Sequence, residues 1–366
     1  MIAAETEPHT GNNFDFLRFL LAVLVIFSHS FLLAGQGGQE PLSLLTRRQT
    51  YLGEIAVDGF FAISGYLITA SWLRSRSVWD YFQKRALRIY PGFLVVSLLC
   101  AFIVGPLGAD SAAAYFHGFP FFSFLRHALL LDKLDLPPTF LYSAVPGQVN
   151  GSLWTIKIEF ECYLLVAALG LAQVFRVRQV PLALLVAALG LELLTLAPHA
   201  RHSLSESAAG HLQFFSAFLV GMVFFLYRDR IVYRPLLLAG AALVLAAGSY
   251  FFWLQAILAL PLVYVLMYAA FSRSAVLHDF GRKRDLSYGL YLYGWPVQQL
   301  LAPYFSGPHS SGPLAPYLLT LTVLPPALAC AWASWHFVEK PSLRLKPKPR
   351  RVADSPESPV PAPAKT

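Results

Sequence analysis

The sequence predicts an all-α, polytopic membrane protein with about ten transmembrane helices and with N- and C-termini in the cytoplasm. Of its 366 residues, 56% are hydrophobic and only 13% are charged, whereas about a quarter of the residues in a soluble globular chain are charged. Apolar runs long enough to cross the hydrocarbon core of a bilayer recur along the chain. Lys and Arg concentrate in alternate connections, which the positive-inside rule assigns to the cytoplasm together with both termini.

Ten apolar runs define the expected spans, and the seventh and eighth runs are nearly continuous. They lie near residues 16–34, 55–73, 92–107, 152–173, 180–197, 211–227, 235–249, 250–271, 288–305 and 314–336. No cleaved signal peptide is expected, because the first run lacks a cleavage site of small residues and continues as a full span. Residues 1–341 are expected to form one transmembrane domain. The Pro-rich, basic segment 342–366 is expected to be a disordered cytoplasmic tail.

The composition argues against several other classes of protein. The net charge of +8 follows the expected membrane orientation and gives no reason to expect a nucleic acid partner. The three cysteines, Cys100, Cys162 and Cys330, all fall inside spans and are expected to pack as small apolar residues. We find no nucleotide-binding motif and no metal-ligand spacing, so no metal is expected.

The first span carries an ionisable residue near its middle. Arg18 and His29 are eleven residues apart, which is just over three helical turns, so they share a face and lie roughly 16 Å apart along the axis. Arg18 would then lie near the cytoplasmic interface and His29 about halfway across the membrane. An ionisable group at that depth is costly and marks a functional site unless a neighbouring helix satisfies it.

The second span carries a carboxylate near its outer end. Asp58 there needs a partner or a water-filled cavity, which makes it a further functional candidate. Gly59 and Gly65 in the same span are expected to form a small-residue face on which another helix packs closely.

The fourth span opens with three charges within five residues. Lys157 and Glu161 are one turn apart and could pair within the helix. Glu159 lies roughly 200° around the helix from Lys157 and is expected to point toward the bundle interior. The alternative is that these charges reach a water-filled vestibule at the outer interface.

Two arginines mark the cytoplasmic side of the third span. Arg85 and Arg88 are three residues apart and would point the same way from a helical turn. Paired guanidinium groups suit phosphate oxygens, although ordinary positive-inside charge is the simpler interpretation. In the ninth span, Pro296 is expected to break the helix in mid-membrane.

Taken together, these residues resemble acyltransferase family 3, the bacterial membrane enzymes that acylate surface and secreted carbohydrates. The motifs occur in family order over residues 13–341, so the resemblance covers nearly the whole chain. They are Arg18 with His29; Asp58-Gly59-Phe60-Phe61 with Ile63 to Leu67; Arg85 and Arg88 with Tyr90-Pro91; Ser152 to Thr155 with Glu159 and Tyr163; Leu286-Ser287-Tyr288 to Trp295-Pro296; and Val338 to Pro341. Each motif alone is unspecific, whereas the ordered set is specific.

The resemblance implies a multi-pass enzyme of the bacterial inner membrane, embedded in membrane lipid. It would transfer an acyl group, most often acetyl, from cytoplasmic acyl-CoA to a hydroxyl of an extracytoplasmic carbohydrate. Acetyl-CoA is the expected donor. Exopolysaccharide, O-antigen, peptidoglycan and small glycosylated metabolites all offer hydroxyls, and an exopolysaccharide or O-antigen, free or lipid-linked, is the expected acceptor. The same resemblance makes 1–341 the acyltransferase domain.

The resemblance also suggests a role for each candidate residue. It makes His29 catalytic, with Arg18 as its partner, and places Arg85 and Arg88 on the acyl-CoA side. We add Asp58 and Glu159 to the catalytic group, where either could orient the imidazole or hold acceptor hydroxyls. The residues expected to bind substrate are Ser152, Trp154, Tyr163 and Trp295. In many family members a second acidic residue follows Glu159, but here Phe160 follows it.

Two mechanisms and one rival function remain open from the sequence. His29 could deprotonate the acceptor hydroxyl within a ternary complex, or could accept the acyl group itself and pass it on. In either case a passage for the CoA arm is expected between Arg85, Arg88 and His29. The rival is a secondary transporter or flippase for a glycan or lipid-linked intermediate, which would also use membrane-buried ionisable residues.

Overall fold

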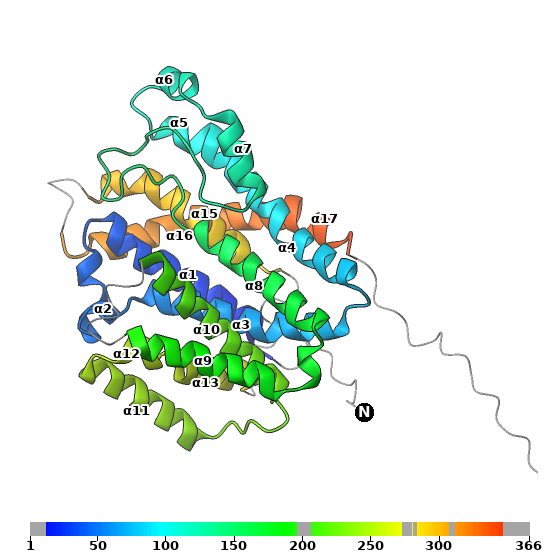
Figure 1. Cartoon of the computed structure of the whole chain (residues 1–366). Helices are drawn as coiled ribbons and strands as arrows, with labels where there is room; N and C mark the ends of the chain where they lie inside the picture. Colours follow the sequence, from blue (N-terminus) through cyan, green and yellow to red (C-terminus); the bar gives the residue numbers. More distant parts are fainter. Residues whose placement is uncertain (1–11, 196–205, 273–279, 281–283, 307–311, 347–366) are drawn as a thin grey trace, which may run out of the picture.

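The computed structural model describes residues 12–195, 206–272, 280, 284–306 and 312–346. Every regular element in these ranges is helical, and the helices pack into one bundle (Figure 1). Most of the predicted tail, residues 347–366, lies outside the described residues. Its first part is described, and the chain continues in helix α17 (Lys340–Leu343) before a turn that ends at Lys346.

Among the described residues, four helices are long and apolar enough to cross a membrane. They are α1 (Phe14–Leu33), α3 (Leu52–Arg74), the continuous helix Val78–Leu107 and the continuous helix Ala315–Leu343. Shorter apolar helices cover Gln179–Leu194, Gly210–Leu226, Pro235–Phe251 and Ala259–Ala270. These helices confirm an all-α membrane protein, whereas the number of ten spans stays a prediction.

The remaining bounds complete the order of elements. The helix Val78–Leu107 comprises α4 (Val78–Leu99), a π-helical segment Cys100–Val104 and α5 (Gly105–Leu107); the helix Ala315–Leu343 comprises α16 (Ala315–Ser334), a π-helical segment Trp335–Glu339 and α17. The others are α2 (Pro41–Leu45), α6 (Ala112–His117), α7 (Phe121–Leu129), α8 (Trp154–Leu171), α9 (Gln179–Thr195), α10 (Glu206–Leu226), α11 (Pro235–Phe251), α12 (Leu254–Ile257), α13 (Ala259–Ala270) and α15 (Ser287–Leu301).

Glycines allow the closest helix pair in the bundle, α3 and α10, to pack. A Cβ at Gly65 would collide with the backbone carbonyl oxygen of Phe218, and one at Gly221 would collide with that of Ala62. Gly59 packs against Leu21 of α1. Close helix approach at both glycines is therefore confirmed, but on two sides of α3, because Gly65 packs on α10 and Gly59 on α1 and the two do not form a single face.

Helices α1 and α15 run side by side in the same direction. Arg18 meets Asp285 at one end of the pair, and the Gln298 amide donates to the backbone oxygen of Ile26 at 2.7 Å nearer the other end. The position of a residue along α15 therefore indicates how far it lies from the Asp285 end of the bundle. Asp285 lies at the cytoplasmic end expected from the positive charges, and Trp295 lies about 15 Å farther along, because ten residues rise by that distance.

The predicted helix break at Pro296 is wrong, because α15 continues through this residue to Leu301. Proline cannot bond to the carbonyl four residues earlier, which here belongs to Leu292. That carbonyl instead accepts a hydrogen bond of 3.0 Å from Nδ2 of Asn150, a residue in the segment leading into α8. The segment thus supplies the partner that keeps the helix intact.

The long connection before α8 is folded against the bundle at one end. It contains α6 and α7, which project beyond the other helices at the top of Figure 1. Gln148 accepts a hydrogen bond of 3.2 Å from the Trp295 indole, and Asp132 accepts one of 2.8 Å from the Lys157 ammonium. Lys157 therefore pairs with this connection, not with Glu161 as its helical spacing suggested.

Candidate active site

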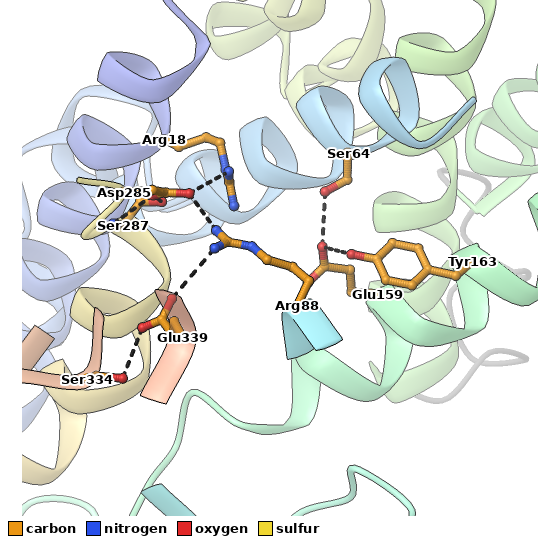
Figure 2. Close-up of polar contacts among 9 residues, drawn as sticks. All are labelled: Arg18, Ser64, Arg88, Glu159, Tyr163, Asp285, Ser287, Ser334 and Glu339. Atoms are coloured by element: carbon orange, nitrogen blue, oxygen red, sulfur yellow. Dashed lines mark hydrogen bonds and ion pairs between the residues drawn. The ribbon is translucent and has the colours of Figure 1, made fainter. Parts of the chain in front are cut away.

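A network of buried charges ties four helices together at the end of the bundle that is expected to face the cytoplasm (Figure 2). Asp285, just before α15, accepts from Arg18 of α1 at 3.1 Å and from Arg88 of α4 at 2.6 Å through the same oxygen. Arg88 reaches on to Glu339 in the π-helical segment after α16, at 3.5 Å. Ser334 donates to Glu339 at 2.9 Å. The network therefore fixes the relative positions of α1, α4, α15 and α16.

Asp285 is the centre of this network. Its second oxygen accepts from the backbone and hydroxyl of Ser287, at 3.1 and 2.5 Å. Burial alone would raise the pKa of Asp285, but the charges of Arg88 and Arg18 outweigh it and hold that pKa well below its usual range. Asp285 is thus ionised at every physiological pH and keeps both guanidinium groups in place.

Arg85 and Arg88 are not an equivalent pair. The Arg88 guanidinium is committed to two carboxylates and also lies over the Tyr288 ring, 5.3 Å from its centroid. Within the described ranges no carboxylate lies within 4.0 Å of Arg85, whose enclosed Nε has no hydrogen-bond partner. Its guanidinium lies 5.9 Å from the centroid of the Tyr163 ring. Arg85 is therefore the arginine whose charge is available to an anion.

Lys346 lies near Arg85 at the same end of the bundle, and these two residues are called the basic mouth below. Helix α17 packs on α4 and brings Lys346 near the charges of Arg85, Arg88, Lys84 and Arg18. Burial, and then those neighbouring cations, lower the pKa of Lys346 to about 7. An anion that binds here would stabilise the charged form of Lys346. Arg85 and Lys346 together are therefore suited to binding phosphate.

A small cavity extends from this network into the bundle. It has a volume of about 50 Å³, and its polar lining comes from Arg18, Ser64, Thr155, Glu159, Ser287 and the two tyrosines Tyr288 and Tyr291. Glu159 accepts from Ser64 at 3.1 Å and from the Tyr163 hydroxyl at 2.6 Å (Figure 2). Glu159 therefore points into the bundle interior, in agreement with its helical position relative to Lys157.

An aromatic and hydroxyl layer closes the cavity on the side away from Arg18. The hydroxyls of Thr155 and Tyr291 are hydrogen-bonded at 2.6 Å, and the rings of Phe60 and Tyr291 meet edge-on with centroids 5.6 Å apart. All three residues line the cavity, whereas His29, Arg85 and Arg88 do not. The cavity thus covers only the middle of the predicted passage to His29.

His29 lies about one helical turn beyond this layer. Its ring meets that of Trp295 edge-on, with centroids 4.7 Å apart, and Trp295 follows Tyr291 by four residues on the same face of α15. The His29 side chain is half-buried, and its enclosed Nδ1 has no hydrogen-bond partner. An imidazole with an unpartnered ring nitrogen is able to accept a proton.

The two carboxylates proposed as partners of His29 lie elsewhere. No hydrogen bond joins His29 to Asp58 or Glu159 in the described structure. Asp58 is 1% exposed and accepts from the Gln213 amide of α10 at 2.8 Å. It therefore faces α10 and does not line the cavity that Glu159 lines.

The four residues expected to bind substrate also separate into groups. Tyr163 and Trp295 are buried, and they contact Glu159 and His29 respectively. Ser152 is buried with no partner for its hydroxyl. Trp154 is 42% exposed beside Phe214 of α10. Only the first two therefore contact other candidate residues.

Several residues of the network, the cavity and the mouth were not predicted from the sequence as site residues, among them Asp285, Ser334, Glu339 and Lys346. Asp285 lies next to the motif that begins at Leu286, and Glu339 lies within the motif Val338 to Pro341, so these motifs could have indicated both residues. Lys346 follows the last motif by five residues and had none. No group of three or more potential metal ligands comes together among the described residues.

Comparison with known proteins decides the family of this chain. The profile of the acyltransferase domain matches residues 12–336, a range that holds His29, the arginines of α4 and the cavity lining. This chain belongs to acyltransferase family 3. The network, the cavity and His29 are therefore parts of a membrane acyltransferase, and Lys346 lies beyond the matched range.

Two curated relatives resemble this acyltransferase 3 protein over most of their length, and a third resembles it over about a third of its own length. The O-acetyl transferase of Shigella phage Sf6 is 29% identical, over 93% of this chain and 98% of its own. Nodulation protein 10 of Rhizobium leguminosarum bv. viciae is 28% identical, over 92% of this chain and 94% of its own. The acyltransferase MdmB of Streptomyces mycarofaciens is 30% identical over 40% of this chain and 36% of its own. No solved structure matches the chain.

Proposed function

We propose that this enzyme transfers an acetyl group from cytoplasmic acetyl-CoA to a hydroxyl of an extracytoplasmic carbohydrate. An exopolysaccharide or O-antigen, free or lipid-linked, is the proposed acceptor. The enzyme would cross the bacterial inner membrane ten times with both termini in the cytoplasm. The observation that carries the proposal is the position of His29, whose Nδ1 is enclosed and unpartnered about one turn beyond a polar cavity that Arg18 lines at its other end.

The donor is proposed to bind at the mouth and reach inward. Arg85 and Lys346 would hold CoA phosphates, while Arg88 keeps the mouth in shape through Asp285 and Glu339. The extended pantetheine arm matches the roughly 16 Å that separate Arg18 and His29 along α1. The described cavity, of about 50 Å³, has room for water but is too small for this arm. Donor binding would therefore displace Phe60 and break the bond between Thr155 and Tyr291.

The chemistry at His29 is general base catalysis of acyl transfer. The imidazole accepts the acceptor's hydroxyl proton as that oxygen attacks the thioester carbonyl. The new C–O bond forms, the C–S bond breaks, and the proton is passed to the CoA thiolate. The variant mechanism places the acyl group first on the His29 ring and then on the acceptor. A single turnover with labelled acetyl-CoA and no acceptor separates them, because only the second leaves label on the protein.

His29→Ala tests the catalytic assignment. Loss of a general base costs about 10²- to 10⁴-fold in rate, so acetylation of the cell's carbohydrate, followed by mass spectrometry, should fall to background. Expression-matched membranes control for protein level. A loss smaller than about tenfold would remove His29 from catalysis.

Arg85→Lys and Arg88→Lys test the division of labour at the mouth. Loss of the fork at Arg85 should raise the KM for acetyl-CoA and leave the folding stability unchanged. The Arg88 variant should lose folding stability, because Asp285 and Glu339 lose a shared partner. If both variants raise the KM for acetyl-CoA equally and neither loses folding stability, the two arginines act as a single phosphate-binding pair and the division of labour is refuted.

The alternative function is a secondary transporter or flippase for a glycan or lipid-linked intermediate. It shares the buried ionisable residues but has no need of unpaired cations at the cytoplasmic mouth. Carbohydrate that reaches the cell surface unacetylated, but in normal amount, in a deletion strain would favour the enzyme. Loss of the carbohydrate itself from the surface would favour the carrier.

A further inference from the structure

A second cavity lies on another flank of the bundle, away from the candidate active site. It has a volume of about 440 Å³ and lies between the α2 region, the start of α3, and helices α11 to α13. Its wall is almost wholly aliphatic, formed by Leu42, Leu45, Ile55, Leu245, Ala246, Leu254, Leu258 and Leu262, and its polar lining comes from Thr46, Arg47, Ser249 and Tyr250. This volume falls within the range of about 300–1,000 Å³ found for small-molecule sites.

One cation lines this apolar cavity. The Arg47 guanidinium lies 4.9 Å from the centroid of the Tyr250 ring and 5.3 Å from that of Phe252. The guanidinium donates a hydrogen bond of 3.3 Å to the backbone oxygen of Tyr250, at the end of α11. This bond uses one of the five N–H groups of Arg47. In the described part of the chain, no carboxylate lies within 4.0 Å of Arg47. Its charge is therefore uncompensated by protein.

The backbone holds Arg47 at the cavity with local strain. Arg47, Arg48 and Phe252 have φ of 53°, 65° and 63°, in the left-handed region that non-glycine residues rarely adopt. The Gln49 side chain fastens this turn, since it donates to the backbone oxygen of Ser249 at 2.7 Å and accepts from the amide of Leu254 at 3.2 Å. Such strain collects at ligand clamps and functional sites.

The surroundings indicate what could occupy the cavity. Tyr250, Phe251, Phe252 and Trp253 are four consecutive aromatic residues and are each more than half exposed. Exposed aromatic residues of this kind form the belt at a membrane–water interface. A ligand that fits this site would have a hydrocarbon part for the aliphatic cavity and an anionic part for Arg47. An anionic membrane lipid has both parts.

We propose that this cavity binds one hydrocarbon chain of an anionic membrane lipid, whose phosphate group is held by Arg47. The aliphatic wall supplies affinity for the chain, and the uncompensated guanidinium supplies selectivity for a charged headgroup. The proposal does not depend on the reaction at His29, so it can fail or succeed separately from the proposed function.

Lipid retention tests the proposal, with Arg48→Gln as the matched control. Arg48 is adjacent, equally charged and equally strained, but it does not line the cavity. The full chain is reconstituted in nanodiscs of phosphatidylcholine with a minor fraction of phosphatidylglycerol and then analysed by native mass spectrometry in detergent. Wild type and Arg48→Gln should retain phosphatidylglycerol in preference to phosphatidylcholine. Arg47→Gln should lose that preference by about tenfold, the loss expected for one charge-assisted contact.

A second variant tests the cavity itself. Ala246→Phe would fill the space with a ring while Arg47 remains, so the retained lipid should fall for both headgroups. Gel filtration and thermal unfolding matched to wild type show that the variant is folded. The proposal is overturned if wild type retains both lipids equally, if Arg47→Gln and Arg48→Gln lose the anionic lipid equally, or if a folded Ala246→Phe retains lipid as wild type does.

Discussion

Asp285→Asn is the substitution that should disturb the cytoplasmic network most with the least change in shape. The side chain keeps its size and can still bond to Ser287, but the charge that holds Arg18 at 3.1 Å and Arg88 at 2.6 Å is lost. Two guanidinium groups that share one oxygen atom would then face each other without that charge between them. Their side chains are only 22% and 13% exposed, so water screens the repulsion weakly.

The cost follows from the burial of the partners. Removing one member of a buried ion pair typically destabilises a protein by about 3–5 kcal/mol, because a charge remains uncompensated. Arg88 keeps Glu339 at 3.5 Å, and Arg18 is exposed enough to be partly hydrated. We therefore expect about 3 kcal/mol, the lower end of that range. The measurement is the free energy of unfolding in mixed micelles.

Two comparisons make this prediction refutable. Asp229→Asn removes a carboxylate that is 62% exposed and lies 3.9 Å from its arginines, and it should cost less than about 1 kcal/mol. The double variant Asp285→Asn with Arg18→Met should be less destabilised than the sum of the single variants, because the orphaned charge is removed too. A cost for Asp285→Asn no greater than that for Asp229→Asn would refute the account of a charge hub.

Two further predictions concern other parts of the chain. Because the pKa of Lys346 lies at about 7 in the folded protein and rises when an anion binds, the KM for acetyl-CoA should increase as pH rises from 7 to 9. Lys346→Met should raise KM and flatten this profile, while Lys340→Met should preserve it; a wild-type profile in Lys346→Met would refute the role. Gly65→Ala should destabilise the protein by about 1–3 kcal/mol through overpacking, since its Cβ would meet the Phe218 carbonyl oxygen. Gly190→Ala is the control, because a Cβ at this position would have nothing within 4 Å, and it should stabilise α9 by about 0.5–1 kcal/mol. Equal free energies of unfolding for the two variants would refute the packing argument.

Much of the fold was predictable because apolar runs and helical angles are local properties. The first two runs, expected near 16–34 and 55–73, are helices Phe14–Leu33 and Leu52–Arg74. The angle of about 200° between Lys157 and Glu159 correctly directed Glu159 inward, because side-chain direction on a helix depends only on residue spacing. Local sequence thus predicted both where these helices lie and which way Glu159 faces.

The errors arose where distant residues decide a local outcome. Pro296 leaves α15 intact because Asn150, which is far away in sequence, satisfies the carbonyl that proline cannot. Asp132 takes Lys157 from its near neighbour Glu161. Arg88 differs from Arg85 only because Asp285 and Glu339 reach it from the C-terminal part of the chain. Contacts between residues that are far apart in sequence cannot be predicted from helical spacing. These contacts determine which charged side chains are free to bind substrate.

The closed layer above the cavity bears on how an enzyme and a carrier would differ in this bundle. A pantetheine arm is thin, and its passage would require a shift of Phe60 and the loss of the bond between Thr155 and Tyr291, a cost of about 0.5–1.5 kcal/mol for the hydrogen bond. A glycan is wide, and its passage would separate α15 from α8 and the segment before it. That separation would also break the hydrogen bonds from Asn150 to Leu292 and from Trp295 to Gln148. Breaking the first would expose the carbonyl that Pro296 leaves without a helical partner. Under the proposed acyl transfer only side chains would have to move, whereas a carrier would have to separate helices, so this layer supports the proposal of an enzyme whose donor reaches inward while its acceptor stays on the outer side.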